Sequence, residues 1–243
     1  MKERIIFGIN TVVKALQNNQ ANLIRIYLLH ELGHKRLKRL EDELRHHSLA
    51  VEYIEAEEMI SLTGSRNHQG AAAVLNAVDE MDQKTALEFL QNITDPIILV
   101  LDGIEDPRNY GACLRTAEAA GVDLVVSSRS RGASITPLVS KVASGALETQ
   151  SIARVANLAR FLKSIQRLNF NIIGLDEKGT VEIFESSLKG PLALLIGAEG
   201  KGLRRLTKEN CDLLVKIPMM GRVESLNVSV AAGICLYEAL RQR

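Results

Sequence analysis

The sequence predicts an α/β protein built around a parallel sheet. Apolar segments of strand length alternate with helical segments through the second half of the chain, which favours a parallel sheet covered on both faces. The run Ile-Ile-Leu-Val-Leu at 97–101 is apolar throughout, as is typical of a central parallel strand. Six of the 17 glycines fall within residues 190–233, and such density at strand ends indicates bare backbone pressed against a ligand or other backbone.

The composition divides the chain into two domains. All 5 histidines lie in the first 68 residues, and all 5 prolines follow residue 95. We therefore predict a small α/β domain over 1–78, a polar linker over 79–95 with a short helix at 86–91, and a larger α/β domain over 96–243.

The elements of the first domain alternate in kind. Asn10 is a suitable N-cap for a helix that runs to about residue 17. The strands and helices that follow are expected at 23–29 (strand), 35–47 (charged amphipathic helix), 51–54 (strand), 55–62 (short helix) and 71–78 (strand).

The second domain continues the alternation. Apolar runs predict strands at 97–101, 122–126, 170–175, 192–196 and 213–217. The intervening segments predict helices at 109–120, 136–143, 157–168, 201–210 and 226–241. The last helix is apolar nearly all round, so it must be covered on two sides. We expect its own sheet on one side and a second copy of the chain on the other, which predicts a homodimer; burial within the monomer is the alternative.

Charge and cysteine content exclude several classes of protein. Lys and Arg number 30 against 29 Asp and Glu, so global charge neither demands nor excludes a nucleic-acid partner. The 3 cysteines show no C-x-x-C spacing, which argues against a disulfide framework or a zinc site. No segment has the apolar length of a signal peptide or membrane span, so we expect a cytoplasmic protein with no membrane or metal partner.

The first motif, residues 106–117, follows the apolar run at 97–101. It reads Asp-Pro-Arg-Asn-Tyr-Gly-Ala-Cys-Leu-Arg-Thr-Ala. Asn109 stands where a helix would be capped, Gly111 permits close approach, and Arg115 is expected near the carboxyl edge of the sheet, where ligands gather in open α/β folds. An ordinary arginine on an exposed helix surface is the alternative.

Two further motifs lie near the C-terminus. In Gly197-Ala198-Glu199-Gly200-Lys201-Gly202 the glycines leave backbone groups free to hold a ligand, although Glu199 could simply complement the dipole of the next helix. In Ser225-Leu226-Asn227-Val228-Ser229, Ser225 could be a plain N-cap. Asn227 lies in an otherwise apolar helix, where a buried amide needs partners, so we expect it to organise a site.

These segments resemble the SpoU group of trefoil-knot RNA 2′-O-methyltransferases, whose motifs read N-x-G-x-x-x-R-T-A, G-x-E-G-x-G and S-L-N-V-S-V-A. His68-Gln69-Gly70 with the small strand after it resembles the end of the family's N-terminal RNA-binding domain, which is similar to ribosomal protein L30e. The resemblance implies a SPOUT-type deep C-terminal trefoil knot after an L30e-like domain. True knots are rare, so this expectation depends on the resemblance alone.

The resemblance also implies a cofactor and a set of site residues. The cofactor is S-adenosylmethionine, held by backbone at Gly197, Ile217, Leu226, Ala198, Met219 and Ser144. The catalytic set is Arg115, Asn109, Glu199, Ser225 and Asn227. The RNA-binding set is Lys35, Arg36, Lys38, Arg39, Arg66, His68, Gln69, Arg129 and Arg131, although each basic cluster also fits a solvated surface.

The length and the middle stretch are similar to the subgroup that methylates the ribose 2′-OH of a guanosine in 23S rRNA. A guanidinium stays protonated in proteins, so we expect Arg115 to hold the 2′-oxygen and stabilise the developing alkoxide rather than act as a base. Two alternatives stay open, a tRNA ribose 2′-O-methyltransferase and a non-catalytic RNA-binding factor in ribosome assembly. An unrelated nucleotide-binding enzyme is disfavoured, because neither G-x-G-x-x-G nor G-x-x-x-x-G-K-[ST] is present.

Overall fold

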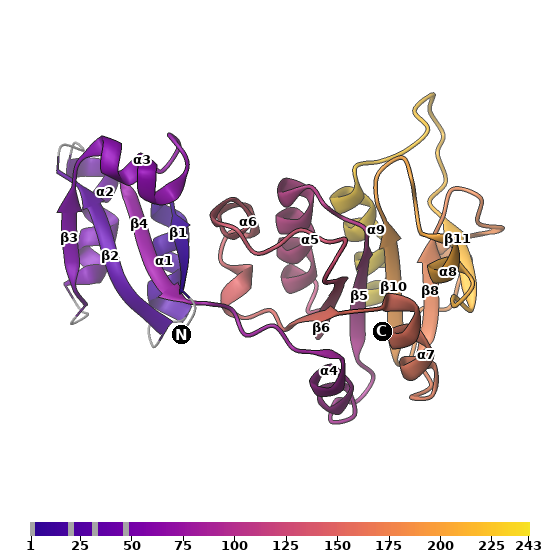
Figure 1. Ribbon diagram of the computed structural model, residues 1–243. Helices are drawn as coiled ribbons and strands as arrows, with labels where there is room; N and C mark the ends of the chain where they lie inside the picture. The colour runs from indigo at the N-terminus through magenta and orange to yellow at the C-terminus, as the bar shows by residue number, and fades with distance from the viewer. Residues whose placement is uncertain (1–2, 19–21, 31–33, 46–48) are drawn as a thin grey trace. The chain divides into compact units, whose positions relative to one another are not determined.

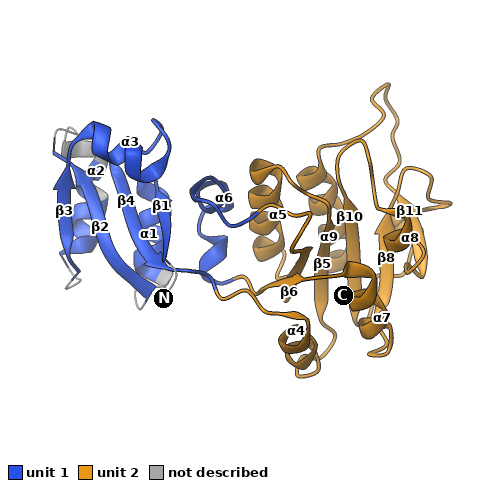
Figure 2. Cartoon of the chain, in the orientation of Figure 1, with its two compact units in different colours: residues 1–78, 134–149 blue, residues 79–133, 150–243 orange. Residues whose placement is uncertain are grey.

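The computed structural model describes residues 3–18, 22–30, 34–45 and 49–243, which form two compact units (Figure 2). Unit 1 contains residues 1–78 and 134–149, and unit 2 contains residues 79–133 and 150–243. The division differs from the predicted one because segment 134–149, expected in the C-terminal domain, packs with the N-terminal unit.

Unit 1 is a four-stranded sheet with helices on both faces. The strands are β1 (Glu3–Phe7), β2 (Leu23–Leu29), β3 (Val51–Ile54) and β4 (Ala71–Asn76), in the order β1-β4-β2-β3. β4 is antiparallel to β1 and β2, whereas β2 and β3 are parallel. Helices α1 (Ile9–Asn18) and α2 (His34–Leu44) pack on one face, and α3 (Ala56–Thr63) packs on the other.

Segment 134–149 is fastened to this sheet by polar contacts. It forms α6 (Pro137–Ala143), which lies against β1, and the 3₁₀ turn Ala146–Glu148. Arg4 Nη2 and Glu148 Oε2 pair at 2.6 Å with side chains 7% and 2% exposed. Lys141 Nζ donates to the Asn67 carbonyl at 2.6 Å. The spacing of apolar residues in a single sequence does not reveal polar contacts between distant segments. This packing could therefore not be predicted from it.

Unit 2 is built on a seven-stranded, wholly parallel sheet. The strands are β5 (Ile97–Asp102), β6 (Leu124–Ser128), β7 (Ile152–Val155), β8 (Asn171–Leu175), β9 (Val181–Glu182), β10 (Leu192–Gly197) and β11 (Leu213–Lys216). Their order is β7-β6-β5-β10-β8-β11-β9. The predicted parallel sheet is therefore confirmed, and β5 is buried along its whole length as the apolar run indicated.

Helices cover both faces of this sheet (Figure 1). α4 (Gln83–Leu90) and α7 (Leu158–Gln166) contribute to a core with β5, β6, β7 and β10. α5 (Pro107–Ala119) packs against α9 (Val228–Gln242), and α9 also contacts β10. No helix in the described part of the chain is long and apolar enough to cross a membrane, and the described residues hold no group of 3 or more His, Cys, Asp or Glu placed to bind a metal.

The predicted helix 201–210 is much shorter in the structure. It begins only at Arg205, as α8 (Arg205–Lys208). The preceding residues form a tight turn in which the backbone N–H groups of Lys201 and Gly202 both donate to the Ala198 carbonyl, at 3.2 and 2.7 Å. The sequence analysis also did not predict strands β1, β7 and β9.

The deep trefoil knot stays a prediction.

Helix α9 is buried on one side and apolar on the other. Ala232, Cys235 and Ala239 are at most 1% exposed and face the interior. Val230 and Tyr237, two turns apart, are 50% and 55% exposed. The apolar outer side predicted from the sequence is therefore present at the surface of this chain.

Candidate active site

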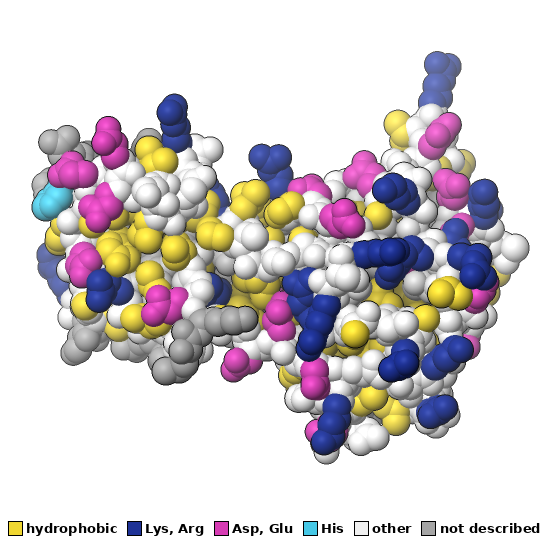
Figure 3. All heavy atoms as spheres, in the orientation of Figure 1, with side chains coloured by type: hydrophobic (Ala, Val, Ile, Leu, Met, Phe, Trp, Pro, Cys, Tyr) yellow, Lys and Arg dark blue, Asp and Glu magenta, His cyan; other side chains and the backbone are white. Residues whose placement is uncertain are grey.

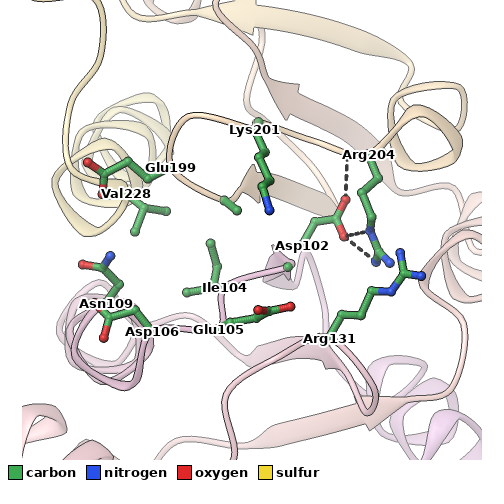
Figure 4. A pocket seen from close by; sticks show the side chains of 13 residues that line it. Asp102, Ile104, Glu105, Asp106, Asn109, Arg131, Glu199, Lys201, Arg204 and Val228 are labelled. Carbon is green, nitrogen blue, oxygen red and sulfur yellow. Dashed lines mark hydrogen bonds and ion pairs between the residues drawn. The ribbon is translucent and has the colours of Figure 1, made fainter.

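A pocket of about 550 Å³ lies at the carboxyl ends of β5 and β10. The chain runs outward from β5 to β6 and β7, while β10 pairs with the other side of β5. This is the switch point where ligands bind in open parallel sheets. The lining residues are Asp102, Gly103, Ile104, Glu105, Asp106, Asn109, Arg131, Ala198, Glu199, Lys201, Gly202, Arg204 and Val228 (Figure 4).

A buried carboxylate joins the two strands at the wall of the pocket. Asp102 ends β5, and its side chain is 0% exposed. Its Oδ1 accepts from Arg204 Nε at 2.5 Å, and its Oδ2 accepts from the Arg204 backbone N–H at 3.0 Å. Charge-assisted hydrogen bonds of this kind are among the stronger ones in proteins. Asp102 therefore fixes the end of the glycine-rich turn that begins at Gly197.

The glycine-rich turn itself is closed by backbone packing. A Cβ on Gly197 would lie 2.0 Å from the Gly202 carbonyl carbon, so the two ends of the turn touch where only glycine fits. Gly202 has a φ of +62°, a conformation that favours glycine. The turn directs Glu199 to the same pocket that Asn109 lines, on the side of the view where Val228 lies (Figure 4).

The first and third motifs meet through two amides. Asn227 Nδ2 donates to Asn109 Oδ1 at 2.9 Å, across 118 residues of sequence. Asn227 Oδ1 caps α9 by accepting from the Ser229 backbone N–H at 3.0 Å. The N-termini of α5 and α9 are thereby fastened together beside the pocket.

The structure brings together only part of the predicted catalytic set. Asn109 and Glu199 line the pocket, and Asn227 contacts Asn109. Ser225 lies in the exposed loop before α9. Arg115 is exposed on α5 and is not among the lining residues. At about 100° per residue, it lies about 120° around the helix axis from Asn109, the residue that contacts Asn227.

The residues predicted to bind the cofactor are also spread. Ala198 lines the pocket, and Gly197 ends the strand that forms its wall. Ile217, Met219 and Leu226 belong to the loop 217–227 and do not line it. Ser144 lies in unit 1, where its carbonyl accepts from Lys14 Nζ at 2.8 Å.

The residues predicted to bind RNA divide between the units. Arg131 lines the pocket and Arg129 is exposed in unit 2, while Lys38 and Arg66 are exposed in unit 1. The Gln69 side chain accepts from the Ile9 backbone N–H at 3.1 Å. The side chains of Lys35, Arg36 and Arg39 lie outside the described residues.

His68 is the buried member of that set. It is 7% exposed, and its Nδ1 accepts from the Gly70 backbone N–H at 3.1 Å. Burial, together with the charge of Lys141, lowers the pKa of this imidazole and so favours its neutral form. In this conformation His68 stabilises the turn before β4.

Sequence reasoning missed Asp102 and Arg204 as site residues. The sequence did point to Asp102, because it is a charged residue that directly follows the apolar run of a central strand. A carboxylate at that edge of a sheet points either to a ligand or to a cation from another segment, and the structure shows the second.

We predict that the amide pair holds α5 and α9 as a unit. In a double-mutant cycle, Asn109→Ala is expected to lower turnover about tenfold, and Asn227→Ala at least as much because it also removes the cap of α9. The double variant should lose little more than Asn227→Ala alone, because that variant already lacks the hydrogen bond between the two amides. The turnover rates of the four proteins measure the coupling. Strictly multiplicative losses would contradict a shared role.

The fold and this pocket define an open parallel α/β enzyme of the type that binds a small cofactor at a sheet edge. The chain belongs to the SpoU rRNA methylase family, whose family model matches residues 96–237. A second family model, for RNA 2′-O ribose methyltransferase substrate binding, matches residues 5–81.

Curated relatives are similar over almost the whole chain. The 23S rRNA (guanosine-2′-O-)-methyltransferase RlmB of Haemophilus influenzae is 44% identical over 240 residues, which cover 98% of this chain and 97% of that protein. The protein of the same name from Vibrio cholerae is 41% identical, and the match covers 100% of this chain and 98% of that protein. Among solved structures, an RNA 2′-O ribose methyltransferase superposes with a TM-score of 0.80 at 28% identity, over 99% of this chain and 89% of that one.

Proposed function

We propose that this protein transfers a methyl group from S-adenosylmethionine to the ribose 2′-OH of a guanosine in 23S rRNA, in the cytoplasm. The meeting of the three motifs at one sheet edge carries this proposal. The glycine-rich turn and Asn109 line one pocket, and Asn227 is hydrogen-bonded to Asn109 beside it, although all three come from distant parts of the chain. The near full-length similarity to rRNA methyltransferases supplies the substrate class.

The pocket fits this cofactor. Its volume of about 550 Å³ lies in the usual range for small-molecule sites. Ile104 and Val228 offer apolar contact to an adenosine, and the turn at Ala198 offers backbone groups to the adenine edge. Glu199 supplies negative charge for a sulfonium. When bound, S-adenosylmethionine supplies an electrophilic methyl group.

The ribose hydroxyl must lose its proton as it attacks, and the role proposed for Arg115 is to stabilise the resulting oxyanion. At about 4 Å and an effective dielectric near 20, opposite unit charges attract by about 4 kcal/mol. A water or a phosphate oxygen takes the proton. Asn109, Glu199, Ser225 and Asn227 orient the RNA and the arginine, and alignment of the two reactants supplies much of the remaining rate.

A second copy of the chain is proposed to bring Arg115 to the pocket. Arg115 is exposed and outside the pocket of its own chain, so one chain alone leaves the oxyanion without this partner. The outer side of α9 carries Val230, Tyr237 and Leu240, each at least 39% exposed, and α9 begins at the pocket with Val228. A symmetric dimer through this side would place the α5 and α9 helices of one copy beside the pocket of the other.

We predict that a charge on this surface separates the dimer. Val230→Asp with Tyr237→Asp is expected to convert the protein to monomer at micromolar concentration, because two carboxylates on each copy would be desolvated in the interface. Light scattering after size exclusion gives the mass. Leu206→Asp is the control, since Leu206 is 52% exposed on a different helix, α8. A dimer that survives the α9 changes would rule out this interface.

The surface of unit 2 suits a polyanionic substrate. Lys and Arg side chains gather over α7 and α8 (Figure 3). Arg160, Lys163 and Arg167 are exposed on or next to α7, which contains no acidic residue. Phosphate contacts from such residues make RNA affinity fall as salt rises.

The N-terminal unit favours rRNA over tRNA as the substrate. The A. aeolicus TrmH/SpoU tRNA modifying enzyme is 31% identical but matches 66% of this chain, with a TM-score of 0.57. The rRNA relatives match the N-terminal unit as well.

Methyl transfer from labelled S-adenosylmethionine tests the proposal. Purified protein is expected to label 23S rRNA at one guanosine 2′-oxygen, located by mass mapping, and to leave tRNA unlabelled. Labelling of tRNA alone would show instead that the protein is a tRNA ribose 2′-O-methyltransferase. Failure to bind the cofactor in calorimetry would instead support a non-catalytic assembly factor.

A further inference from the structure

We propose that Arg131 and Arg204 form an oxyanion-binding clamp at one end of the pocket, and that its ligand is a phosphodiester next to the methylated ribose. This inference rests on the proposed RNA substrate and adds a binding site to it. The two arginines come from different segments, the loop after β6 and the residues before α8, yet both line the pocket. Their guanidinium groups point toward one another beside Asp102 (Figure 4).

The Arg204 side chain is held in place by Asp102 and leaves one end of its guanidinium group open to a ligand. Its Nε and Nη2 each lie 2.5 Å from Asp102 Oδ1, and the Arg204 side chain is 36% exposed. A guanidinium has five N–H donors in a planar fork. Asp102 engages one edge of this fork, and the described residues provide no partner for Nη1, so that end is available to a ligand.

Arg131 is presented by a loop that is pinned at both ends. The Arg129 backbone N–H donates to the Val155 carbonyl at 2.9 Å, and the Ala133 backbone N–H donates to the Ile104 carbonyl at 2.9 Å. Since Ile104 lines the pocket, the far end of the loop is fastened to the pocket wall itself.

A buried arginine fills the inside of this loop. Arg154 is 8% exposed, and its Nη atoms donate to the carbonyls of Ser128, Arg129, Gly132 and Ala133 at 3.1 to 3.3 Å. Glycine is required at position 132 of this loop, because a Cβ there would lie 2.9 Å from the Ser128 carbonyl oxygen. Arg131 is thereby held on a rigid loop, while its own side chain is exposed.

The charges of the pocket are arranged to attract an anion at this end. Arg131 forms no ion pair within the described residues, and Asp102 neutralises only one of the two guanidinium groups. Asp106 and Glu199 lie toward the other end of the view, with Glu105 between the two ends (Figure 4). Two guanidinium forks that converge on one point suit the bidentate recognition of phosphate.

Two sources could supply the oxyanion, an RNA phosphodiester or the carboxylate of the cofactor. We favour the phosphodiester because Arg131 is exposed and reachable by a macromolecule. The test compares the wild type with R131Q, R131K, R204Q and the control K84Q, whose side chain is 84% exposed on α4 and pairs with Glu88. RNA affinity is measured by fluorescence anisotropy on an rRNA hairpin fragment at several salt concentrations, and cofactor affinity by calorimetry.

For a phosphodiester, R131Q and R204Q should each weaken RNA binding about tenfold and reduce the slope of log Kd against log salt by about 0.7. R131K should keep the slope but bind less tightly, since an ammonium lacks the planar fork. Cofactor affinity should stay within about twofold in R131Q. If the cofactor affinity falls about tenfold with the RNA slope unchanged, the clamp holds the cofactor carboxylate instead.

If R131Q and R204Q match K84Q in both measurements, the clamp is overturned. R131Q keeps this test independent of folding, because Arg131 is exposed and packs in no core. A failure of the proposed function would look different, since the wild-type protein would then bind neither the rRNA fragment nor the cofactor.

Discussion

Replacing Arg115 with alanine is expected to lower the rate of methyl transfer by at least about 100-fold, a loss of the size seen when an oxyanion-stabilising donor is removed. The affinity for S-adenosylmethionine should be nearly unchanged, because Arg115 does not line the pocket of its own chain. The protein should also stay folded, since the side chain is exposed. Single-turnover rates and calorimetry separate the two effects.

Arg108→Ala is the matched control for this variant. Arg108 is exposed on the same helix, seven residues earlier and therefore on nearly the same face as Arg115. It should retain methylation within about threefold of the wild type. Unchanged methylation in Arg115→Ala would remove this arginine from the mechanism.

Mixing two inactive variants decides which copy supplies Arg115. When Arg115→Ala is mixed with Glu199→Ala and the subunits exchange, a hybrid dimer contains one pocket with Glu199 intact and the partner's Arg115 intact. If the arginine acts across the dimer, about one quarter of the wild-type activity should return. If it acts within its own chain, every site keeps one defect and no activity returns.

Regular patterns in the sequence predicted the sheet and part of the pocket. The apolar run at 97–101 defined the central strand, and the Gly197–Gly202 motif was placed at the sheet edge where it is found. Asn227 was expected as a buried amide within the last helix, which was wrong, because it is exposed and caps α9; it does have a partner in Asn109. These features depend on residue type and spacing within short segments, which one sequence displays directly.

The errors involve contacts between distant segments. Helical spacing from 201 to 210 favoured one helix, but the hydrogen bonds to Ala198 and the pairing of Arg204 with Asp102 hold residues 201–204 in a turn. Residues 134–149 joined unit 1 through partners such as Arg4 and Asn67, more than 70 residues away. A periodicity that is local in sequence contains no information on such partners.

Gly197→Ala is expected to abolish cofactor binding, with an affinity loss of at least about 100-fold. The added Cβ would lie 2.0 Å from the Gly202 carbonyl carbon and 2.2 Å from the Leu203 nitrogen. Both atoms belong to backbone, so no side chain can rotate away to make room. Overpacking of this kind costs about 1–3 kcal/mol or more, and each 1.4 kcal/mol is about a factor of ten in affinity.

The turn has little freedom to relieve this clash by moving. Leu203 is 3% exposed, and Arg204 is fastened to Asp102 through its backbone and its side chain. Relief therefore requires the hydrogen bond from the Gly202 N–H to the Ala198 carbonyl, 2.7 Å in the native turn, to break. That change displaces Ala198 and Glu199 from the pocket, so binding is lost even if the rest of the fold survives.

Gly221→Ala is the matched control, because Gly221 has nothing within 4 Å of its Cβ position and lies in an exposed loop. Calorimetry with S-adenosylmethionine measures both variants, and circular dichroism reports whether each is folded. A folded Gly197→Ala protein that binds the cofactor within about threefold of Gly221→Ala would show that the turn is not part of the cofactor site. Loss of binding in Gly197→Ala alone would assign the site to this turn, since both variants carry the same chemical change.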